Sequence, residues 1–461
     1  MLSSFRSALP NEARAVLRLA LPVVTGQLFA MGMNVADTLL AGRYSGHALG
    51  VVAVGSAVWS LVIIIVLGFL YALPPLVSEL DGAGRRDRIA AVVSQAVWLG
   101  LLIGCGLFFA VRQVGPILVM MRVDSALIAD VVQFLRAISW GAPALALFFV
   151  LRYFSEGIGY SRATLIFSAL GMALFIPIGS VLVFGYLGFS ARGALGCAIA
   201  MAVSLWLQVI AFIVFVLRHP VYRDLDLLRR FARPRWSGMR HLLALGGPIA
   251  FMVLMEGSMF VVAALLISRL GGTAVASHQI AINVGSVAFM VPLGIGAATT
   301  VRVGNALGAG DLPRLRAAVC AGLGWVLIAQ LLLATTMAGF AGAISGWYTH
   351  EMAVIGLASQ LLLVCAIFQF SDGLQAVASA ALRGLKDVRL PAVLTLIAYW
   401  GIGMSLGAWL CFGRGQGAIG MWWGLAAGLS ASAILLLTRL WILVGRRSPL
   451  VGVQPTSTGP N

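Results

Sequence analysis

Charged residues are scarce in this chain. Asp, Glu, Lys and Arg make up 10% of its 461 residues, and there are 15 acidic residues against 31 Lys and Arg. Hydrophobic residues account for 61% of the chain, and the mean hydropathy is +1.01. This composition excludes a soluble globular domain and indicates a polytopic membrane protein.

The sequence also lacks the motifs of the common enzyme classes. It contains no Walker sequence for ATP, no HExxH and no Ser/His/Asp arrangement, and its five histidines do not cluster with acids at metal-ligand spacing. The five cysteines lie in or at the ends of apolar segments without CxxC spacing, so we interpret them as small hydrophobic residues. We therefore expect neither an enzyme nor a bound cofactor, and any pumping must draw on an ion gradient.

Twelve apolar segments approach the length of about 20 residues that a membrane-spanning helix needs. They run near 15–41, 47–72, 89–111, 130–152, 163–186, 193–217, 241–268, 275–300, 315–339, 355–382, 390–412 and 418–444. A run such as Leu61 to Leu70 is apolar on every side, unlike the alternating strands of a barrel. The predicted fold is an all-α integral membrane protein with 12 transmembrane helices.

The net charge of +16 is distributed as a topology signal. Basic residues concentrate in alternate loops, most densely between Arg218 and Arg240, and the intervening loops are poorer in them. By the positive-inside rule, both termini and the Arg218 to Arg240 loop are expected in the cytoplasm. The loop has few interleaved aromatic residues, so we expect no nucleic-acid partner.

The two halves of the chain are similar to each other. An offset of 226 residues aligns Pro22 with Pro248, Gly68 with Gly294, and Gly82-Ala83-Gly84 with Gly308-Ala309-Gly310, without a gap over more than sixty residues. Six helices per unit place both units the same way up, related by a pseudo-two-fold axis along the membrane normal. The predicted domains are an N-terminal lobe (1–217), a linker loop (218–240), a C-terminal lobe (241–445) and a cytoplasmic tail (446–461).

Three acids lie in the middle of long apolar segments: Asp37, Glu256 and Asp372. A carboxylate at the bilayer centre costs about 2.5 kcal/mol or more, and no Lys or Arg lies mid-helix nearby in sequence to neutralise it. We expect these carboxyls to be neutral or bound to a cation, a state suited to exchanging a proton or metal ion for a cationic solute. Glu256 and Asp37 have no counterpart in the other half, because Ala occupies the positions equivalent to them, 30 and 263.

Other polar residues share helical faces with these acids. Such amides and hydroxyls are equally compatible with interhelical hydrogen bonds worth on the order of 0.6 kcal/mol each. The faces comprise Gln27, Asn34, Asp37 and Thr38; Met252, Glu256, Met259 and Phe260; Gln279, Asn283 and Ser286; and Phe368, Asp372, Gln375 and Ser379.

Four stretches resemble the multidrug and toxic compound extrusion (MATE) family, within its bacterial NorM-like branch. They are PIAFMVLMEGSMF from Pro248, GGTAVASHQIAIN from Gly271, PLGIGAATTVRVGNALGAG from Pro292 and FQFSDGLQAVASAALRG from Phe368. The resemblance implies two six-helix lobes that form a V and export cationic or amphiphilic drugs and dyes by antiport with Na⁺ or H⁺. It further implies a multi-pass protein of the bacterial inner membrane, with organic cations and the lipid bilayer as partners, and we expect a monomer.

The same resemblance implies roles for individual residues. Glu256 and Asp372 match the cation-coupling carboxylates, and would be the metal ligands if the ion is Na⁺, while Asp37 matches the acid of the N-terminal lobe. Phe368 stands where some relatives have Tyr, and the fifth helix lacks the acid of archaeal members. The expected substrate-binding residues are Asp37, Glu256, Met259, Gln279, Asn283, Glu351, Phe368 and Asp372.

Two alternative functions remain open at this point. A lipid-linked oligosaccharide flippase of the same superfamily should have a basic cavity, whereas Arg136 is the main candidate for an arginine within the helices. An intramembrane aspartyl hydrolase would need two acids within sharing distance of one proton, and the sequence offers no motif-flanked pair.

Overall fold

The computed structural model describes residues 2–120 and 124–446, which form helices and their connections without any strand. Helix α1 (Leu2–Tyr44) is followed by α2 (Gly46–Leu70), α3 (Leu73–Gly82), η1 (Arg86–Arg88), α4 (Ile89–Arg112), α5 (Gly115–Met120), α6 (Ser125–Ile138), η2 (Ser139–Gly141), α7 (Ala142–Gly157), α8 (Arg162–Phe184) and α9 (Gly193–Arg218). The second half contains η3 (Pro220–Leu225), α10 (Trp236–Ile267), η4 (Ser268–Leu270), α11 (Gly272–Gly308), α12 (Leu312–Gly339), α13 (Ala341–Tyr348), α14 (Met352–Gly384), α15 (Arg389–Leu396), η5 (Ile397–Met404), α16 (Ser405–Ala408), η6 (Trp409–Gly413) and α17 (Gly417–Arg446).

The described residues contain 12 helical segments long and apolar enough to cross a membrane, as predicted. Several are longer than the sequence indicated, and α11 has 37 residues, or about 55 Å at 1.5 Å per residue. The hydrocarbon core is only about 30 Å thick, so such helices project beyond it. The predicted tail, 446–461, lies outside the described residues except for Arg446.

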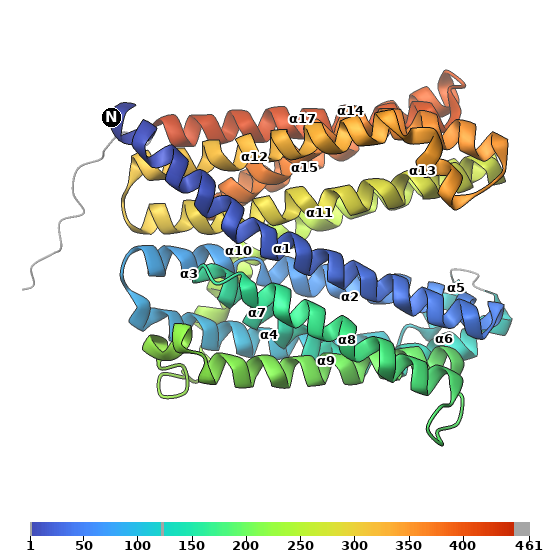
Figure 1. Ribbon diagram of the computed structural model, residues 1–461, viewed down its shortest axis with the longest axis horizontal. Helices are drawn as coiled ribbons and strands as arrows, with labels where there is room; N and C mark the ends of the chain where they lie inside the picture. The colour runs from blue at the N-terminus through green and yellow to red at the C-terminus, as the bar shows by residue number, and fades with distance from the viewer. Residues whose placement is uncertain (1, 121–123, 447–461) are drawn as a thin grey trace, which may run out of the picture.

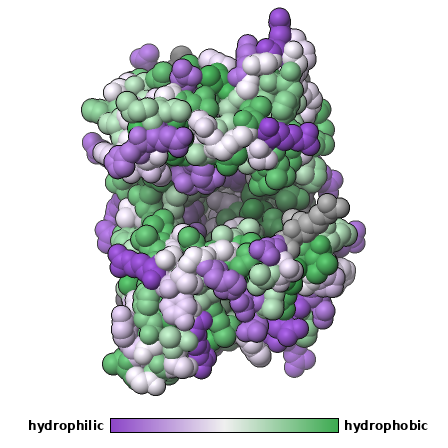
Figure 2. Space-filling view, turned by 90° about the vertical axis from the view of Figure 1, so that its right-hand side faces the viewer, coloured by the Kyte–Doolittle hydropathy of each residue, from purple (hydrophilic) through white to green (hydrophobic). Residues whose placement is uncertain are grey.

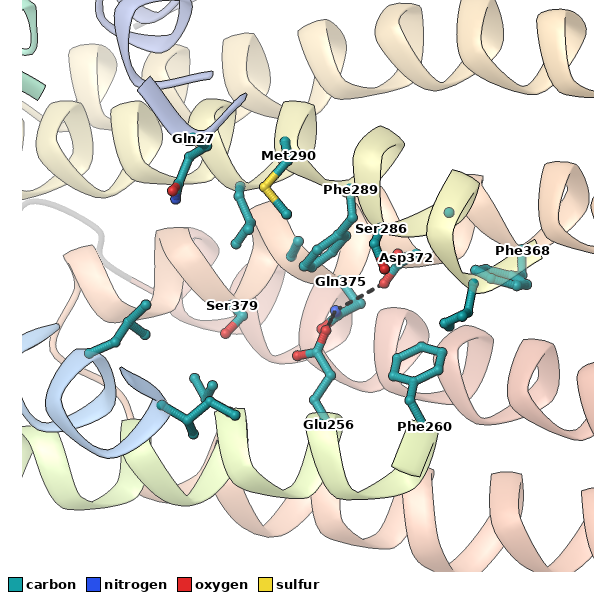
Figure 3. Close-up of a pocket in the computed structure, with 18 of the residues that line it drawn as sticks. Gln27, Glu256, Phe260, Ser286, Phe289, Met290, Phe368, Asp372, Gln375 and Ser379 are labelled. Carbon is teal, nitrogen blue, oxygen red and sulfur yellow. Dashed lines mark hydrogen bonds between the residues drawn. The ribbon is translucent and has the colours of Figure 1, made fainter. Parts of the chain in front are cut away.

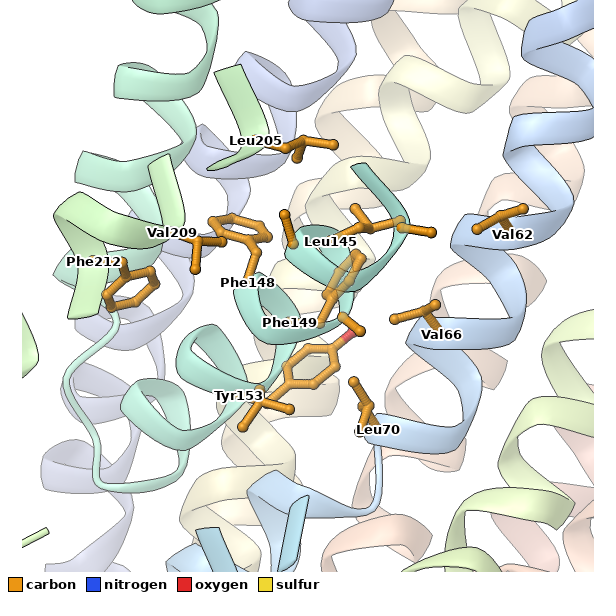
Figure 4. Packing of buried hydrophobic residues seen from close by; sticks show 14 of the residues in the cluster. Val62, Val66, Leu70, Leu145, Phe148, Phe149, Tyr153, Leu205, Val209 and Phe212 are labelled. Atoms are coloured by element: carbon orange, nitrogen blue, oxygen red, sulfur yellow. The ribbon is translucent and has the colours of Figure 1, made fainter. Parts of the chain in front are cut away.

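The helices form two bundles, one from α2 to α9 and the other from α11 to α17 (Figure 1). Helix α10 packs against both, because Leu242 and Ile249 lie in the core of the first bundle and Met259 and Ala263 in the core of the second. Bulky side chains fill the first, where Phe148, Phe149, Tyr153 and Phe212 pack between the helices (Figure 4). Burial of such aromatic and branched side chains, with rings in tilted contact, stabilises the bundle. Smaller residues dominate the core of the second bundle, and Trp422 is its largest fully buried side chain.

Helix α1 crosses diagonally from the second bundle to the first (Figure 1). Near its start, Val16 and Ala20 pack among residues of α11, α12 and α14, and the Ala13 carbonyl accepts a hydrogen bond from Trp325 Nε1 at 2.9 Å. Further along, Gly26 approaches Thr164 of α8. The first helix of the predicted N-terminal lobe therefore packs against both bundles.

Close glycine contacts between the bundles reveal the symmetry of the duplication. A Cβ on Gly82 would lie 2.0 Å from the Asn305 carbonyl oxygen, and a Cβ on Gly308 would lie 2.0 Å from the Glu79 carbonyl oxygen. Both residues of the second contact are displaced by 226 from those of the first, with the partners exchanged. Such reciprocity is the property of a two-fold interface, and it agrees with the predicted pseudo-two-fold relation.

The bundles meet at one end of the molecule, which we call the basic end because Arg85, Arg86 and Arg88 lie there together with the linker. Glu79 pairs with Lys386 at this end, and Asp81 Oδ2 accepts from Asn305 Nδ2 at 3.1 Å. At the other end, the space-filling view shows a hollow between the bundles (Figure 2). The molecule is thus closed at the basic end and open at the opposite end.

The linker at the basic end is attached to α4. Gln95 Nε2 donates to the Arg233 carbonyl at 2.9 Å, and its Oε1 accepts from the Arg235 backbone N–H at 2.8 Å. Trp98 Nε1 donates to the Ala232 carbonyl at 3.1 Å. These bonds satisfy backbone groups between η3 and α10, where the chain is not helical.

Candidate substrate and cation site

A cavity of about 350 Å³ lies between α10, α11 and α14, with contributions from α1 and α2. Its volume falls within the range of small-molecule sites. The lining is mostly apolar with a few polar groups: Gln27, Ile64, Leu67, Tyr71, Val253, Glu256, Gly257, Phe260, Ile282, Gly285, Ser286, Phe289, Met290, Leu293, Phe368, Asp372, Gln375, Ala376, Ser379, Arg383 and Trp422.

Two carboxyls meet at one amide in this cavity (Figure 3). Gln375 Nε2 lies 3.4 Å from both Glu256 Oε1 and Asp372 Oδ1 and donates to them. Gln375 Oε1 in turn accepts from Tyr399 O–H at 3.0 Å, which fixes the direction of the amide. An acid on α10 and an acid on α14 are thereby held at a single point.

The surroundings of these acids explain how α14 presents them. Asp372 and Gln375 are three residues apart on one helix, a spacing that places both side chains on the same face. Asp372 is 5% exposed and Tyr399 is 1% exposed, so water has little access to this part of the site. Their remaining oxygen lone pairs can bind a proton or a hard cation such as Na⁺.

Aromatic side chains line the cavity on the side of Phe368. The Phe368 ring lies 5.6 Å from the ring of Trp422, and Trp422 Nε1 donates to His278 Nδ1 at 3.1 Å. Phe260 projects from α10 near the carboxyls (Figure 3). Aromatic faces attract organic cations, so this lining suits a flat, positively charged amphiphile.

The structure brings only part of the predicted set together. Glu256, Asp372 and Phe368 line the cavity, whereas the other predicted substrate-binding residues do not. Met259 is 0% exposed in the core of the second bundle. Although it follows Glu256 by three residues, its side chain packs against neighbouring helices and not into the cavity. The other predicted substrate-binding residues outside the cavity lining are Asp37, Gln279, Asn283 and Glu351.

Asp37 lies in the first bundle, away from the cavity. It is 5% exposed and therefore faces the protein interior, and it lies beside Ser56 and Cys197. Its Oδ1 has no hydrogen-bond partner among the described residues. Gln279 and Glu351 are exposed, and Glu351 precedes α14 at the open end. Neither lines the cavity in this conformation, and their role in substrate binding stays a prediction.

No Lys or Arg lies near these acids in the sequence, but the fold brings one into their cavity. Arg383, eight residues after Gln375, lines the same cavity as Glu256. Arg152 is buried as well, and its Nε donates to Glu156 Oε1 at 2.8 Å. Arg136, by contrast, is exposed. The internal repeat contained a signal that Arg383 is buried. At an offset of 227 residues, Arg383 aligns with Glu156, which is buried itself.

Comparison with known proteins agrees with this architecture. The MatE family model matches the chain twice, over residues 22–181 and 248–409. The chain belongs to the MATE family. The two matches begin 226 residues apart, which is the offset of the internal repeat.

Relatives place this MATE protein in the NorM-like branch. It is 42% identical to the "Probable multidrug resistance protein NorM" of Xanthomonas campestris pv. campestris, over 92% of this chain and 93% of the relative. It is 38% identical to the "Multidrug resistance protein PmpM" of Pseudomonas aeruginosa, over 93% of this chain and 91% of the relative.

Solved structures share its fold. The eukaryotic MATE transporter AtDTX14 superposes with a TM-score of 0.85 at 21% identity, covering 95% of this chain and 98% of that one. A structure described as the outward-facing conformation of a multidrug resistance MATE family transporter gives a TM-score of 0.87 at 18% identity, over 94% and 96% of the two chains.

Proposed function

We propose that this MATE protein is a multidrug efflux transporter that exports cationic and amphiphilic compounds in exchange for Na⁺ or H⁺. The observation that carries the proposal is the pair of carboxyls, Glu256 and Asp372, held by the Gln375 amide in a cavity of drug size. The names of its NorM and PmpM relatives support the substrate class.

The carboxyl pair provides a physical basis for antiport. A coupling ion can shift the conformational equilibrium only through different affinities for the two states. Competition between the ion and a cationic substrate for Glu256 and Asp372 supplies such a difference, because either one can neutralise the pair. Each charge that crosses the membrane with the potential contributes about 2.3 kcal/mol per 100 mV.

The closed basic end supports an orientation. The arginine bias favours placing the basic end in the cytoplasm, so the hollow at the opposite end would face outward and the conformation would be the one that releases substrate. Asp37, isolated in the first bundle, would act on the conformational change of that bundle separately from ion binding at Glu256 and Asp372.

A flippase for lipid-linked oligosaccharides is less well supported. Such a carrier should hold a pyrophosphate in a basic cavity, whereas this cavity contains two carboxyls and a single arginine. An aspartyl hydrolase is disfavoured because a glutamate, not a second aspartate, accompanies Asp372.

Dye efflux from proteoliposomes under separately imposed Na⁺ and H⁺ gradients tests the proposal. We expect one of the two gradients to drive export of an ethidium-like dye, and Glu256→Gln or Asp372→Asn to abolish it, because each change removes a titratable charge and keeps the size. Asp87→Asn, which alters an exposed carboxyl outside the cavity, is the matched control. Export at the parent rate by a folded double variant Glu256→Gln/Asp372→Asn would contradict the coupling assignment.

A further inference from the structure

A second cavity, of about 590 Å³, lies at the basic end between α1, the connection from α7 to α8, and α11. It shares no lining residue with the cavity that contains Glu256. Its lining includes the arginines Arg14, Arg18, Arg162 and Arg302, and none of the described residues that line it is acidic. The cavity is therefore strongly electropositive.

Three of these arginines have no counter-ion. Within residues 2–120 and 124–446, Arg14, Arg18 and Arg162 form no ion pair within 4.0 Å. The acids nearest to them along the chain are Glu12 and Glu156. Glu12 already accepts from arginines of α11 and α12, and Glu156 accepts from one of α7. The charge of the three guanidinium groups is thus left for a ligand to balance.

A buried hydroxyl adds a neutral donor to this cavity. Ser161 lines it and is only 4% exposed. It does not cap α8, and its hydroxyl forms no hydrogen bond with another described residue. Buried polar side chains are normally hydrogen-bonded, so an unpartnered hydroxyl at this position indicates a missing ligand atom.

The arrangement of the donors suits a phosphate group. Arg14 and Arg18 are four residues apart on α1 and share a face, and Arg162 is the first residue of α8. A guanidinium binds phosphate oxygens through two parallel N–H groups. A phosphate has four oxygens and can accept from several arginines and a hydroxyl together, whereas a carboxylate has only two.

An apolar strip on α1 continues from the arginines toward the middle of the membrane-spanning segment. Leu21 follows Arg18 by three residues and Leu28 follows Leu21 by seven, so the three lie on one face. The leucines are 57% and 42% exposed. An anionic group at the end of an apolar strip has the geometry of a phospholipid, and basic pockets between membrane helices bind acidic headgroups.

We propose that Arg14, Arg18, Arg162 and Ser161 form a binding site for a phosphate group, supplied by an anionic phospholipid of the leaflet at the basic end. The acyl chains pack along the face of α1 that carries Leu21. A bound headgroup joins α1 to α8 and stabilises the folded protein, as any ligand of the native state does. The site is separate from the transport cavity, and its occupancy is measured without transport.

Lipid binding to the purified protein tests the site. Native mass spectrometry in detergent gives the dissociation constant of the first bound lipid, with dioleoyl phosphatidylglycerol as the anionic probe and dioleoyl phosphatidylcholine as the zwitterionic one. We expect the parent to bind phosphatidylglycerol at least about tenfold more tightly. The triple variant Arg14→Gln/Arg18→Gln/Arg162→Gln should lose this preference, and Arg162→Gln alone should lose part of it.

The matched control removes the same charge from the linker at the same end. Arg229→Gln/Arg230→Gln/Arg233→Gln alters three exposed arginines outside the cavity, and it should keep the parent preference. An equal loss in the two triple variants would show that only the total charge of this end attracts the lipid, and would overturn the site. An unchanged preference in the cavity variants would overturn it as well.

Thermal unfolding distinguishes a lipid from a soluble phosphate. Phosphatidylglycerol in mixed micelles should raise the unfolding midpoint of the parent more than that of the cavity triple variant. Millimolar inorganic phosphate should not raise it, because that ion has no acyl chain to pack against Leu21 and Leu28. An equal rise with inorganic phosphate would contradict the lipid as the source, and no rise with either probe would contradict the site.

Discussion

Buried charges in this protein are stabilised in three different ways. Glu156 forms a direct ion pair with Arg152, and the side chains are 3% and 4% exposed. Glu256 and Asp372 share a neutral amide, and Arg383 lies against an aromatic ring. The first arrangement neutralises the charge permanently, whereas the other two leave charge available to an ion or a substrate.

The permanent pair should be important for stability. In Glu156→Gln, Arg152 becomes an unpaired buried charge, and breaking a buried pair in this way costs about 3–5 kcal/mol. We expect a clear fall in the thermal unfolding midpoint of the purified protein in detergent. Thr164→Val replaces only the hydroxyl, which donates to Glu156 Oε1 at 2.8 Å, by a methyl group, and it should lower the midpoint less. Equal effects of the two changes would show that the ion pair adds nothing beyond a neutral hydrogen bond.

At the scale of elements, the last two spans pack unusually closely. The eleventh span is interrupted by the π-helical segments η5 and η6, and Gly403 and Gly407 bring its backbone against Gly424 and Gly428 of α17. Small residues are typical of such contacts in membranes, where close van der Waals packing replaces the hydrophobic effect between helices. Tyr399, the residue that orients Gln375, lies in η5, so this packing positions part of the cation site.

Gly424→Ala should therefore disturb both packing and the site. A Cβ at this position would lie 2.1 Å from Gly407 Cα, and such overpacking costs typically about 1–3 kcal/mol. We expect a lower unfolding midpoint and weaker dye binding. Gly445→Ala on the same helix meets nothing within 4 Å and serves as the control. An unchanged midpoint for Gly424→Ala would mean that the eleventh span and α17 can move apart without a loss of stability.

At the scale of the whole molecule, a continuous set of polar contacts holds the basic end closed. This closure network consists of Glu12, Asp81, Arg302, Asn305 and Arg314. Glu12 Oε1 accepts from Arg302 Nη2 at 2.6 Å and from Arg314 Nε at 2.7 Å. Arg314 Nη2 donates to Asn305 Oδ1 at 2.9 Å, and Asn305 reaches Asp81 of the other bundle. The network links α1, α3, α11 and α12 at the end where alternating access requires a gate.

Weakening this network should open the basic end. Hydrogen bonds to charged groups contribute about 1.5–3 kcal/mol, and 1.4 kcal/mol corresponds to tenfold in an equilibrium. In a cysteine-free background, Ser78→Cys reports opening, because Ser78 is 0% exposed against Gly304 in the seam. We expect Glu12→Gln to raise the rate of maleimide labelling at this cysteine by about tenfold or more. Glu351→Gln should not raise it, and a Glu12→Gln rate equal to that of the parent would show that packing alone keeps the end closed.

The sequence by itself determined the twelve spans and the duplication, and it singled out Glu256 and Asp372, the two acids that meet in the cavity. These follow from local rules: a span is recognised by its own hydrophobicity, a repeat by its own residues, and a shared helical face by its own periodicity. The family resemblance added the expected roles, and these stay predictions until transport is measured.

Only the tertiary structure decided which helical faces meet. Periodicity places Met259 and Gln279 on polar or soft faces but does not say which neighbour each face contacts, so both fell outside the cavity. It also could not place Arg383 in the cavity that Glu256 lines, because the two residues lie on different helices, α14 and α10. Helix packing is a long-range property, and for that reason the position of Arg383 in the cavity and the closure network became visible only in the folded protein.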